Sequence, residues 1–139
     1  METKELDIEA KADNLEQVIT LVDSMLETVD CPLKLQMQIE LAVEEIFVNI
    51  ANYAYAPGTG RVHIRLTLSD PPVTAEIVFI DSGVQYDPLA KEDPDITLSA
   101  EQREIGGLGI FLTKKTMDEV SYSYSGGNNI LTLRKVIFP

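Results

Sequence analysis

Glu45-Ile46-Phe47-Val48-Asn49 is the stretch of sequence that decides the fold. It lies within residues 32–54, where apolar residues recur at helical spacing, so the pattern predicts one long amphipathic helix. Glu45 and Asn49 stand at positions i and i+4, which places them on the same helix face. Asn52 follows one turn later and extends this polar end of the helix.

A carboxylate and an amide on one helix face can share chemical work. The carboxylate of Glu45 can orient an attacking hydroxyl or water, or accept its proton. The amide oxygen of Asn49 can ligate Mg²⁺, which keeps most of its waters and takes few protein ligands. A solvated helix face is the alternative interpretation, because Glu44 stands beside Glu45 and charged helix residues usually face water.

A second polar segment, Asp81-Ser82-Gly83, follows the apolar residues 77–80 of a predicted strand. The carboxylate of Asp81 can accept the exocyclic N–H of adenine while the flat base packs on apolar side chains. Gly83 has no side chain, so a base or sugar can approach closely there. Tyr86 follows just before a polar loop. An ordinary β-turn explains Asp-Ser-Gly equally well.

A third segment, Gly106-Gly107-Leu108-Gly109, precedes the apolar residues 110–112 of a predicted helix. Glycines at a helix N-terminus expose backbone N–H groups and the positive end of the helix dipole, which together suit a phosphate. The segment is not a Walker loop, because no Gly-Lys-Ser/Thr follows, and it does not form the first strand-to-helix turn of a dinucleotide fold. The alternative is a flexible loop end.

Periodicity along the chain predicts a single α+β domain over residues 1–139. Strands are predicted at 4–9, 61–68, 73–80, 120–124 and 130–138, and helices at about 14–29, 32–54 and 108–117. Residues 126–129 are predicted to form the last hairpin turn, and Asp13 or Asn14 to cap the first helix. The polar stretch 88–104 is either a functional lid or disordered. This order favours a two-layer α/β sandwich, with helices on one face of a mixed, mostly antiparallel sheet.

Composition restricts the partners that the chain can have. Its formal net charge of −12 repels nucleic acid and anionic membranes. The same field repels ATP, so a nucleotide site would need a divalent cation and backbone N–H groups. No segment has the length of a membrane span or the composition of a signal peptide, and the single cysteine excludes an internal disulfide. We therefore expect a cytoplasmic protein that binds neither nucleic acid nor membrane directly.

The three segments resemble the N, G1 and G2 boxes of the GHKL ATPase superfamily, which includes gyrase, histidine kinases and MutL. The resemblance implies the Bergerat fold of histidine-kinase-like ATPases, with Glu45 as the catalytic residue and Asn49 as the Mg²⁺ ligand. It also implies a larger set of residues that contact ATP: Asn49, Asn52, Asp81, Gly83, Tyr86, Gly106, Gly107, Leu108 and Gly109.

A closer resemblance, over about residues 5–136, is to the stand-alone anti-sigma-factor serine/threonine kinases of the RsbW type. It rests on residues 41–55, 81–88, 107–112, 117–120 and 126–135. The chain departs from the pattern at Asn128-Asn129, where wider superfamily members carry a Gly-Thr adenine contact, and at Leu108, where some relatives have arginine.

This resemblance implies a Mg·ATP-dependent protein kinase in a bacterial partner switch. Such a kinase binds a sigma factor in one state and phosphorylates an anti-anti-sigma (STAS-domain) protein in the other. Residues 88–104 would form a lid ordered by the γ-phosphate, and a homodimer is expected. Two alternatives stay open: a binding switch that uses ATP without phosphoryl transfer, and an interaction module whose glycines are only turns.

Overall fold

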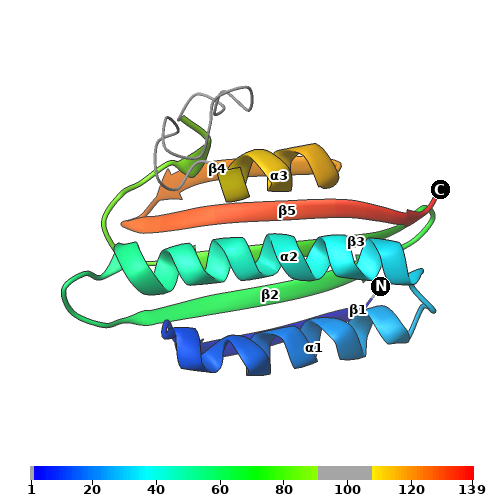
Figure 1. Cartoon of the computed structure of the whole chain (residues 1–139), viewed down its shortest axis with the longest axis horizontal. Coiled ribbons are helices and arrows are strands. Elements are labelled where there is room, and N and C mark those ends of the chain that lie inside the picture. The colour runs from blue at the N-terminus through cyan, green and yellow to red at the C-terminus, as the bar shows by residue number, and fades with distance from the viewer. Residues whose placement is uncertain (1, 91–107) are drawn as a thin grey trace.

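The computed structural model describes residues 2–90 and 108–139. This part of the chain folds into five strands and three α-helices (Figure 1). Their bounds are β1 Glu2–Glu9, α1 Leu15–Glu27, α2 Leu33–Asn49, β2 Arg61–Ser69, β3 Val73–Asp81, α3 Leu108–Thr116, β4 Glu119–Ser125 and β5 Asn128–Phe138. Every predicted strand and helix segment is present, and the expected α+β class is confirmed. Of the predicted lid, only the short turn Pro88–Ala90 lies within the described residues.

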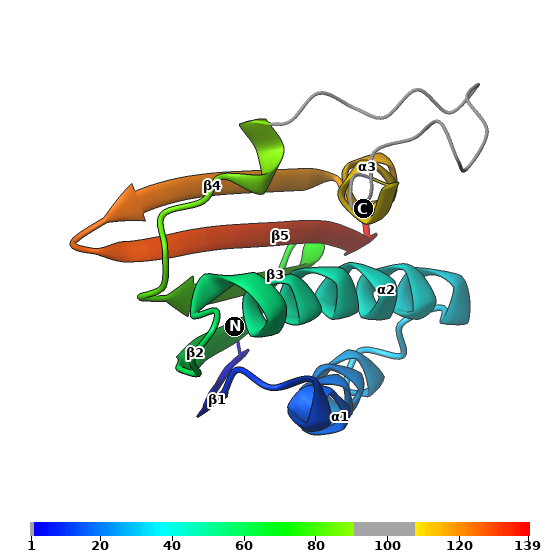
Figure 2. The same cartoon turned by 60° about the vertical axis from the view of Figure 1, so that its left-hand side comes forward.

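The strands form one sheet in the order β1-β2-β3-β5-β4. All neighbouring strands of this sheet pair antiparallel, so it is simpler than the mixed, mostly antiparallel sheet that the sequence predicts. The three α-helices lie together on one face of the sheet (Figure 2). The result is a two-layer sandwich, an arrangement in which an antiparallel sheet can leave its other face in water.

Alternation along β2 supplies part of the core. Val62, Ile64, Leu66 and Leu68 are buried, whereas the residues between them are half-exposed. Helices α1 and α2 cover this surface, and the largest buried side chains between the layers are Met25, Ile39, Phe47, Ile64, Ile77, Phe79 and Leu133. Burying one such side chain stabilises the fold by about 1.5–3 kcal/mol. The core therefore fixes α2 against the middle of the sheet.

The turn between β4 and β5 is shorter than predicted. Gly126 and Gly127 both have positive φ, of 59° and 81°, and together make a two-residue turn. Such a turn matches the twist of the flanking strands and is easily adopted by glycine. Consequently Asn128 and Asn129 belong to β5, and Asn129 shares the buried face of that strand with Leu131.

The start of α1 also differs from the prediction. Asn14 forms no side-chain cap, because the short turn Ala12–Asn14 leads directly into the helix with Asn14 already in helical conformation. Its Nδ2 instead donates to the backbone oxygen of Glu9 at 2.8 Å. Asn14 therefore stands at the predicted N-cap position, but its side chain ties the helix to the end of β1 instead of capping it.

The sheet face opposite the helices is polar. Arg61 Nε lies 2.6 Å from Asp7 Oδ1, which joins β2 to β1. Arg134 Nη2 lies 2.5 Å from Glu76 Oε2, which joins β5 to β3. Solvent screens such exposed ion pairs, so each contributes little to the stability of the fold. Their charged side chains keep this face of the sheet polar and solvated.

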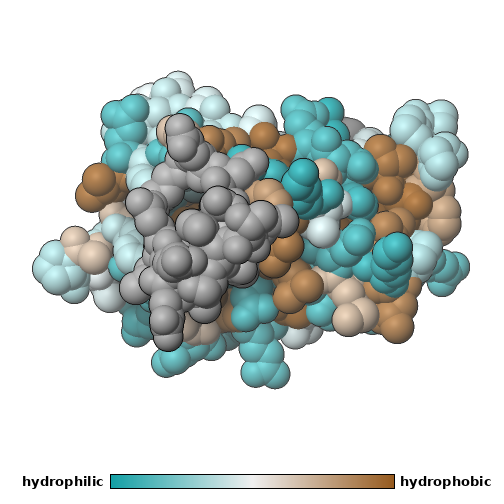
Figure 3. Space-filling view, turned by 45° about the horizontal axis from the view of Figure 1, so that its top comes forward, coloured by the Kyte–Doolittle hydropathy of each residue, from teal (hydrophilic) through white to brown (hydrophobic). Residues whose placement is uncertain are grey.

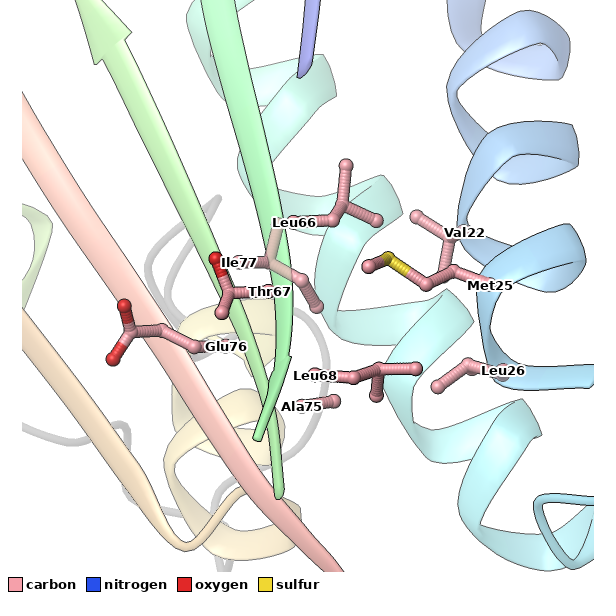
Figure 4. Close-up of a pocket in the computed structure, with 9 residues that line it drawn as sticks. All are labelled: Val22, Met25, Leu26, Leu66, Thr67, Leu68, Ala75, Glu76 and Ile77. Carbon is pink, nitrogen blue, oxygen red and sulfur yellow. The ribbon is translucent and has the colours of Figure 1, made fainter. Parts of the chain in front are cut away.

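A small pocket lies between α1 and the neighbouring ends of β2 and β3 (Figure 4). Its lining is mostly aliphatic and includes Val22, Met25, Leu66, Leu68 and Ile77. It lies toward the start of β3, whereas Asp81 ends that strand, so the pocket is separate from the polar segments that the sequence analysis singles out. Within the described ranges, no helix is both long and apolar enough to cross a membrane.

Two acidic side chains meet between the first two helices. The carboxyl of Glu40 on α2 lies beside Asp23 on α1. Burial raises the pKa of Glu40 above its ordinary value, and the neighbouring Asp23 adds to this effect. Asp23 Oδ1 is buried and has no hydrogen-bond partner in the described structure.

We expect Glu40→Gln to raise the melting temperature at pH 7. The raised pKa means that the folded protein binds this proton more tightly than the unfolded chain does. Protonated Glu40 stabilises the folded state fully below its ordinary pKa near 4.5. This stabilisation is lost as the pH rises through the raised pKa of the folded state. Thermal melting at about pH 4 and pH 7 measures the difference. Glu44→Gln, at an exposed position of the same helix, is the control, and an equal gain from both variants would contradict the assignment.

Candidate functional site

The polar end of α2 carries the acid–amide pair. Asn49 Nδ2 donates to Glu45 Oε1 at 3.1 Å, and both side chains are half-buried. The i and i+4 spacing therefore brings these two groups together as the sequence predicts. The hydrogen bond uses the amide nitrogen of Asn49 and leaves its Oδ1, the atom that suits Mg²⁺, without a partner in residues 2–90 and 108–139.

The last turn of this helical segment, Ile50–Ala54, is π-helical. Such wide turns often mark functional sites. The loop after β3 supplies hydrogen bonds to this end of the helix: Val84 N donates to Ala54 O at 2.8 Å, and Ser82 N donates to the Tyr55 hydroxyl at 2.9 Å. The first and second polar segments are thereby joined through backbone groups.

Gly83 lies in close contact with the π-helical turn. A Cβ at this position would overlap the carbonyl group and the side chain of Ala54. Only glycine fits without a shift of backbone. From the sequence, this glycine is expected to allow the approach of a base or sugar, whereas packing against Ala54 explains it without any ligand.

Asp81 ends β3 on the buried face of the sheet and is 5% exposed. Its Oδ1 accepts hydrogen bonds from Gly83 N and from Asn129 Nδ2, both at 2.9 Å. Its Oδ2 accepts none from the residues described. A buried carboxylate with one oxygen held and the other available is suited to accept an N–H group from a ligand.

The start of α3 meets the polar end of α2. Gly109 lies so close to Glu45 that a Cβ at position 109 would overlap the Glu45 carboxylate. The third segment thus reaches the first, and the second reaches the π-helical turn that continues the same helix. The structure gathers these predicted residues around one end of α2, and their contacts with a ligand stay predictions.

Other residues that are predicted to contact ATP are less clearly part of this cluster. Asn52 and Tyr86 are exposed, although the backbone N–H of Tyr86 donates to Asn129 Oδ1 at 3.1 Å. Leu108 begins α3. Gly106 and Gly107 lie outside the described residues.

Asn129 also belongs to the site, although the sequence predicts that it lies in a turn. It pairs with Asp81 in the β3–β5 register and is 6% exposed. The Tyr122 hydroxyl on β4 donates to Asn129 Oδ1. The sequence does hold a signal for it, because Asn129 continues the alternation of Leu131 and Leu133 and so is a polar residue at a buried-face position.

Comparison with known proteins now identifies the family. The model of the histidine kinase-like ATPase domain matches residues 8–135. This chain belongs to the histidine kinase-like ATPase family. The resemblance to GHKL ATPases described above is thereby confirmed.

Curated members of this family are similar to the chain over most of its length. Serine/threonine-protein kinase BtrW of Bordetella bronchiseptica is 31% identical over 101 residues, which cover 72% of this chain and 70% of BtrW. Serine-protein kinase RsbW of Listeria monocytogenes is 24% identical over 103 residues, which cover 70% of this chain and 64% of that protein. RsbW of Bacillus licheniformis is 31% identical over 96 residues, 58% of its length. The predicted enzyme class, a serine/threonine kinase of this ATPase family, agrees with these relatives.

Solved structures of histidine kinase-like ATPases share the fold. The structure of the RsbU and RsbW domains of a Mycobacterium tuberculosis protein matches with a TM-score of 0.70 at 13% identity, covering 100% of this chain and 33% of that one. The histidine kinase domain of the blue-light-activated kinase EL346 from Erythrobacter litoralis matches with a TM-score of 0.52 at 12% identity, covering 91% and 60%. At these identities the matches establish the two-layer fold of the ATPase domain.

We expect Gly83→Ala to destabilise the domain by about 1–3 kcal/mol, because its methyl group would overlap the backbone of Ala54. Urea denaturation measures the loss. Gly58→Ala is the matched control, since a Cβ there would lie 3.4 Å from Tyr55 O, an ordinary contact. Equal midpoints and slopes for Gly83→Ala and the wild type would show that the loop does not pack on α2 as described.

Proposed function

We propose that this chain is a Mg·ATP-dependent serine/threonine protein kinase of a bacterial partner switch. It would phosphorylate an anti-anti-sigma (STAS-domain) protein in one state and bind a sigma factor in the other. The observation that carries the proposal is the meeting of three segments at one end of α2, with Gly109 against Glu45 and Gly83 against Ala54. The names of the relatives BtrW and RsbW, both serine kinases, support the kinase activity in this proposal.

The described residues fit Mg·ATP. Asp81 Oδ2 would accept the exocyclic amine of adenine, and the backbone N–H groups at the start of α3 would face phosphate. Asn49 Oδ1 would bind Mg²⁺. The described part of the chain holds no group of three or more His, Cys, Asp or Glu side chains suited to a metal, and an ion held largely by phosphates and water needs none. When bound, Mg·ATP supplies the γ-phosphoryl group and the divalent charge that offsets its negative charge.

Glu45 would act on the acceptor hydroxyl. Its Oε1 is held by Asn49 Nδ2, and its Oε2 accepts no hydrogen bond from the described residues, so Oε2 is the oxygen available to a serine or threonine hydroxyl. The carboxylate would orient that hydroxyl and accept its proton during transfer. The absence of a side chain at Gly109 lets the start of α3 adjoin this base.

An exposed apolar row favours a protein as the acceptor. Leu33, Met37 and Leu41 precede Glu45 at four-residue intervals on α2, and each of these three side chains is more than half exposed. On the side of the molecule that carries α3, apolar and hydrophilic groups are interleaved (Figure 3). A row of apolar side chains that leads to the base offers contact area to a protein carrying the hydroxyl, whereas a small acceptor would not need it.

The remaining features of the proposal follow from the resemblance to RsbW-type kinases rather than from contacts in the chain. The kinase would act as a homodimer in the cytoplasm, where sigma factors meet RNA polymerase. The net charge of −12 opposes direct binding of nucleic acid, so control of transcription would pass through protein partners.

We expect Glu45→Gln to retain Mg·ATP binding and to lose phosphoryl transfer by about 10²–10⁴-fold, the usual contribution of a positioned base. Transfer of labelled γ-phosphate to a STAS-domain partner from the same cell measures the activity, and a thermal shift with Mg·ATP measures binding. Glu44→Gln is the matched control, because Glu44 is the exposed neighbour on the same helix. Full transfer by Glu45→Gln would remove this residue from the proposed role.

The same assays separate the alternatives. A wild-type chain that is stabilised by Mg·ATP but labels no partner would be a binding switch without phosphoryl transfer. A chain whose melting temperature does not respond to Mg·ATP would be an interaction module.

A further inference from the structure

We propose that Asn129 is a positioning residue for nucleotide selectivity, because it holds the Asp81 carboxylate in the one orientation that presents Oδ2 to the 6-amino group of adenine. Asn129 itself would not touch the base. The inference rests on the proposed nucleotide site and adds to it the residue that makes the site selective for adenine.

Every hydrogen-bonding group of the Asn129 side chain is in use. Nδ2 donates to Asp81 Oδ1 and to Val84 O, both at 2.9 Å. Oδ1 accepts from the Tyr122 hydroxyl and from Tyr86 N. An asparagine side chain has two N–H donors and two acceptor lone pairs, so this environment satisfies it completely.

These partners also fix which way the amide faces. If the amide were reversed, its oxygen would face two acceptors, the Asp81 carboxylate and Val84 O, and its NH₂ would face the backbone N–H of Tyr86. Both of these contacts would be repulsive. Because the site is buried, polar groups left without hydrogen bonds would also cost free energy. The amide therefore directs its NH₂ group toward Asp81 and Val84 O and cannot flip to direct its oxygen there.

The consequence falls on Asp81. Its Oδ1 receives two hydrogen bonds, one from Gly83 N and one from Asn129 Nδ2. Rotating the carboxylate would break both in a nearly buried position, so the rotation is strongly disfavoured. Oδ2 is left as the oxygen that a ligand N–H can reach.

Tyr122 supports Asn129 from the neighbouring strand. The Tyr122 hydroxyl donates to Asn129 Oδ1, and burial raises the pKa of Tyr122, which further favours the protonated form that can donate. Tyr124, two residues later on β4, stands opposite Asn129 in the strand register and is 42% exposed. The two tyrosines thus provide a pair of variants on one strand, of which only Tyr122 donates its hydroxyl to Asn129.

The test compares ATP with inosine triphosphate, which carries a carbonyl oxygen where adenine has its 6-amino group. Calorimetry with Mg²⁺ on the full chain gives the ratio of the two affinities. We expect the wild type to prefer ATP. Asn129→Ser removes the carboxamide that donates to Asp81 Oδ1 and Val84 O. It should lower the ratio about tenfold to a hundredfold, the effect of losing a fixed hydrogen bond to a charged group. Affinity for inosine triphosphate should change little.

Tyr122→Phe should lower the same ratio by a smaller factor, about threefold to tenfold, since Asn129 Oδ1 keeps its bond from Tyr86 N. Tyr124→Phe should leave the ratio unchanged. A merely structural role for Asn129 would weaken both nucleotides alike and would not move the ratio. Should Asn129→Ser fail to fold, the two tyrosine variants decide the question.

The outcomes separate this inference from the proposed function. If the wild type prefers ATP and both Asn129→Ser and Tyr122→Phe keep the wild-type ratio, the positioning role is wrong and the nucleotide site stands. Equal wild-type affinity for the two nucleotides also overturns the inference. If the wild type binds neither nucleotide, the proposed function fails and this inference fails with it.

Discussion

The close approach of α2 to two glycines is the constraint on which the site depends. One face of α2 is buried against the sheet through residues such as Ile39, Val43 and Phe47, so the helix cannot move to accommodate its neighbours. The loop after β3 can reach its polar end only because position 83 carries no side chain, and at the start of α3 a Cβ on position 109 would displace the Glu45 carboxylate. The core thus fixes the helix, and the two glycines let the other segments come to it.

Much of this arrangement can be predicted from the sequence because it follows from local periodicity. The helical spacing of apolar residues predicts α2, and the i and i+4 spacing of Glu45 and Asn49 predicts that their side chains meet. Alternation marked β2 and β3, so the position of Asp81 at a strand end was also foreseeable. These features depend on residues that are close in the chain.

The features that escaped prediction depend on contacts between distant segments. The π-helical turn Ile50–Ala54 accepts a hydrogen bond from Val84 N at Ala54 O. No local sequence pattern connects these two distant segments. The sequence predicts a turn for Asn129 because Gly126-Gly127-Asn128-Asn129 resembles a four-residue loop. The positive φ angles of the two glycines close the turn within two residues, and this single difference moves Asn129 from solvent to the buried face opposite Asp81.

The helix-free face of the sheet has a consequence for how such a protein can diversify. Its cross-strand pairs, Arg61 with Asp7 and Arg134 with Glu76, lie on the side away from α2 and from the buried carboxylate of Asp81. Substitutions there exchange one solvated group for another and leave the packing between the layers intact. A domain built this way can accept many substitutions on the helix-free face of its sheet without losing the packing that defines the fold.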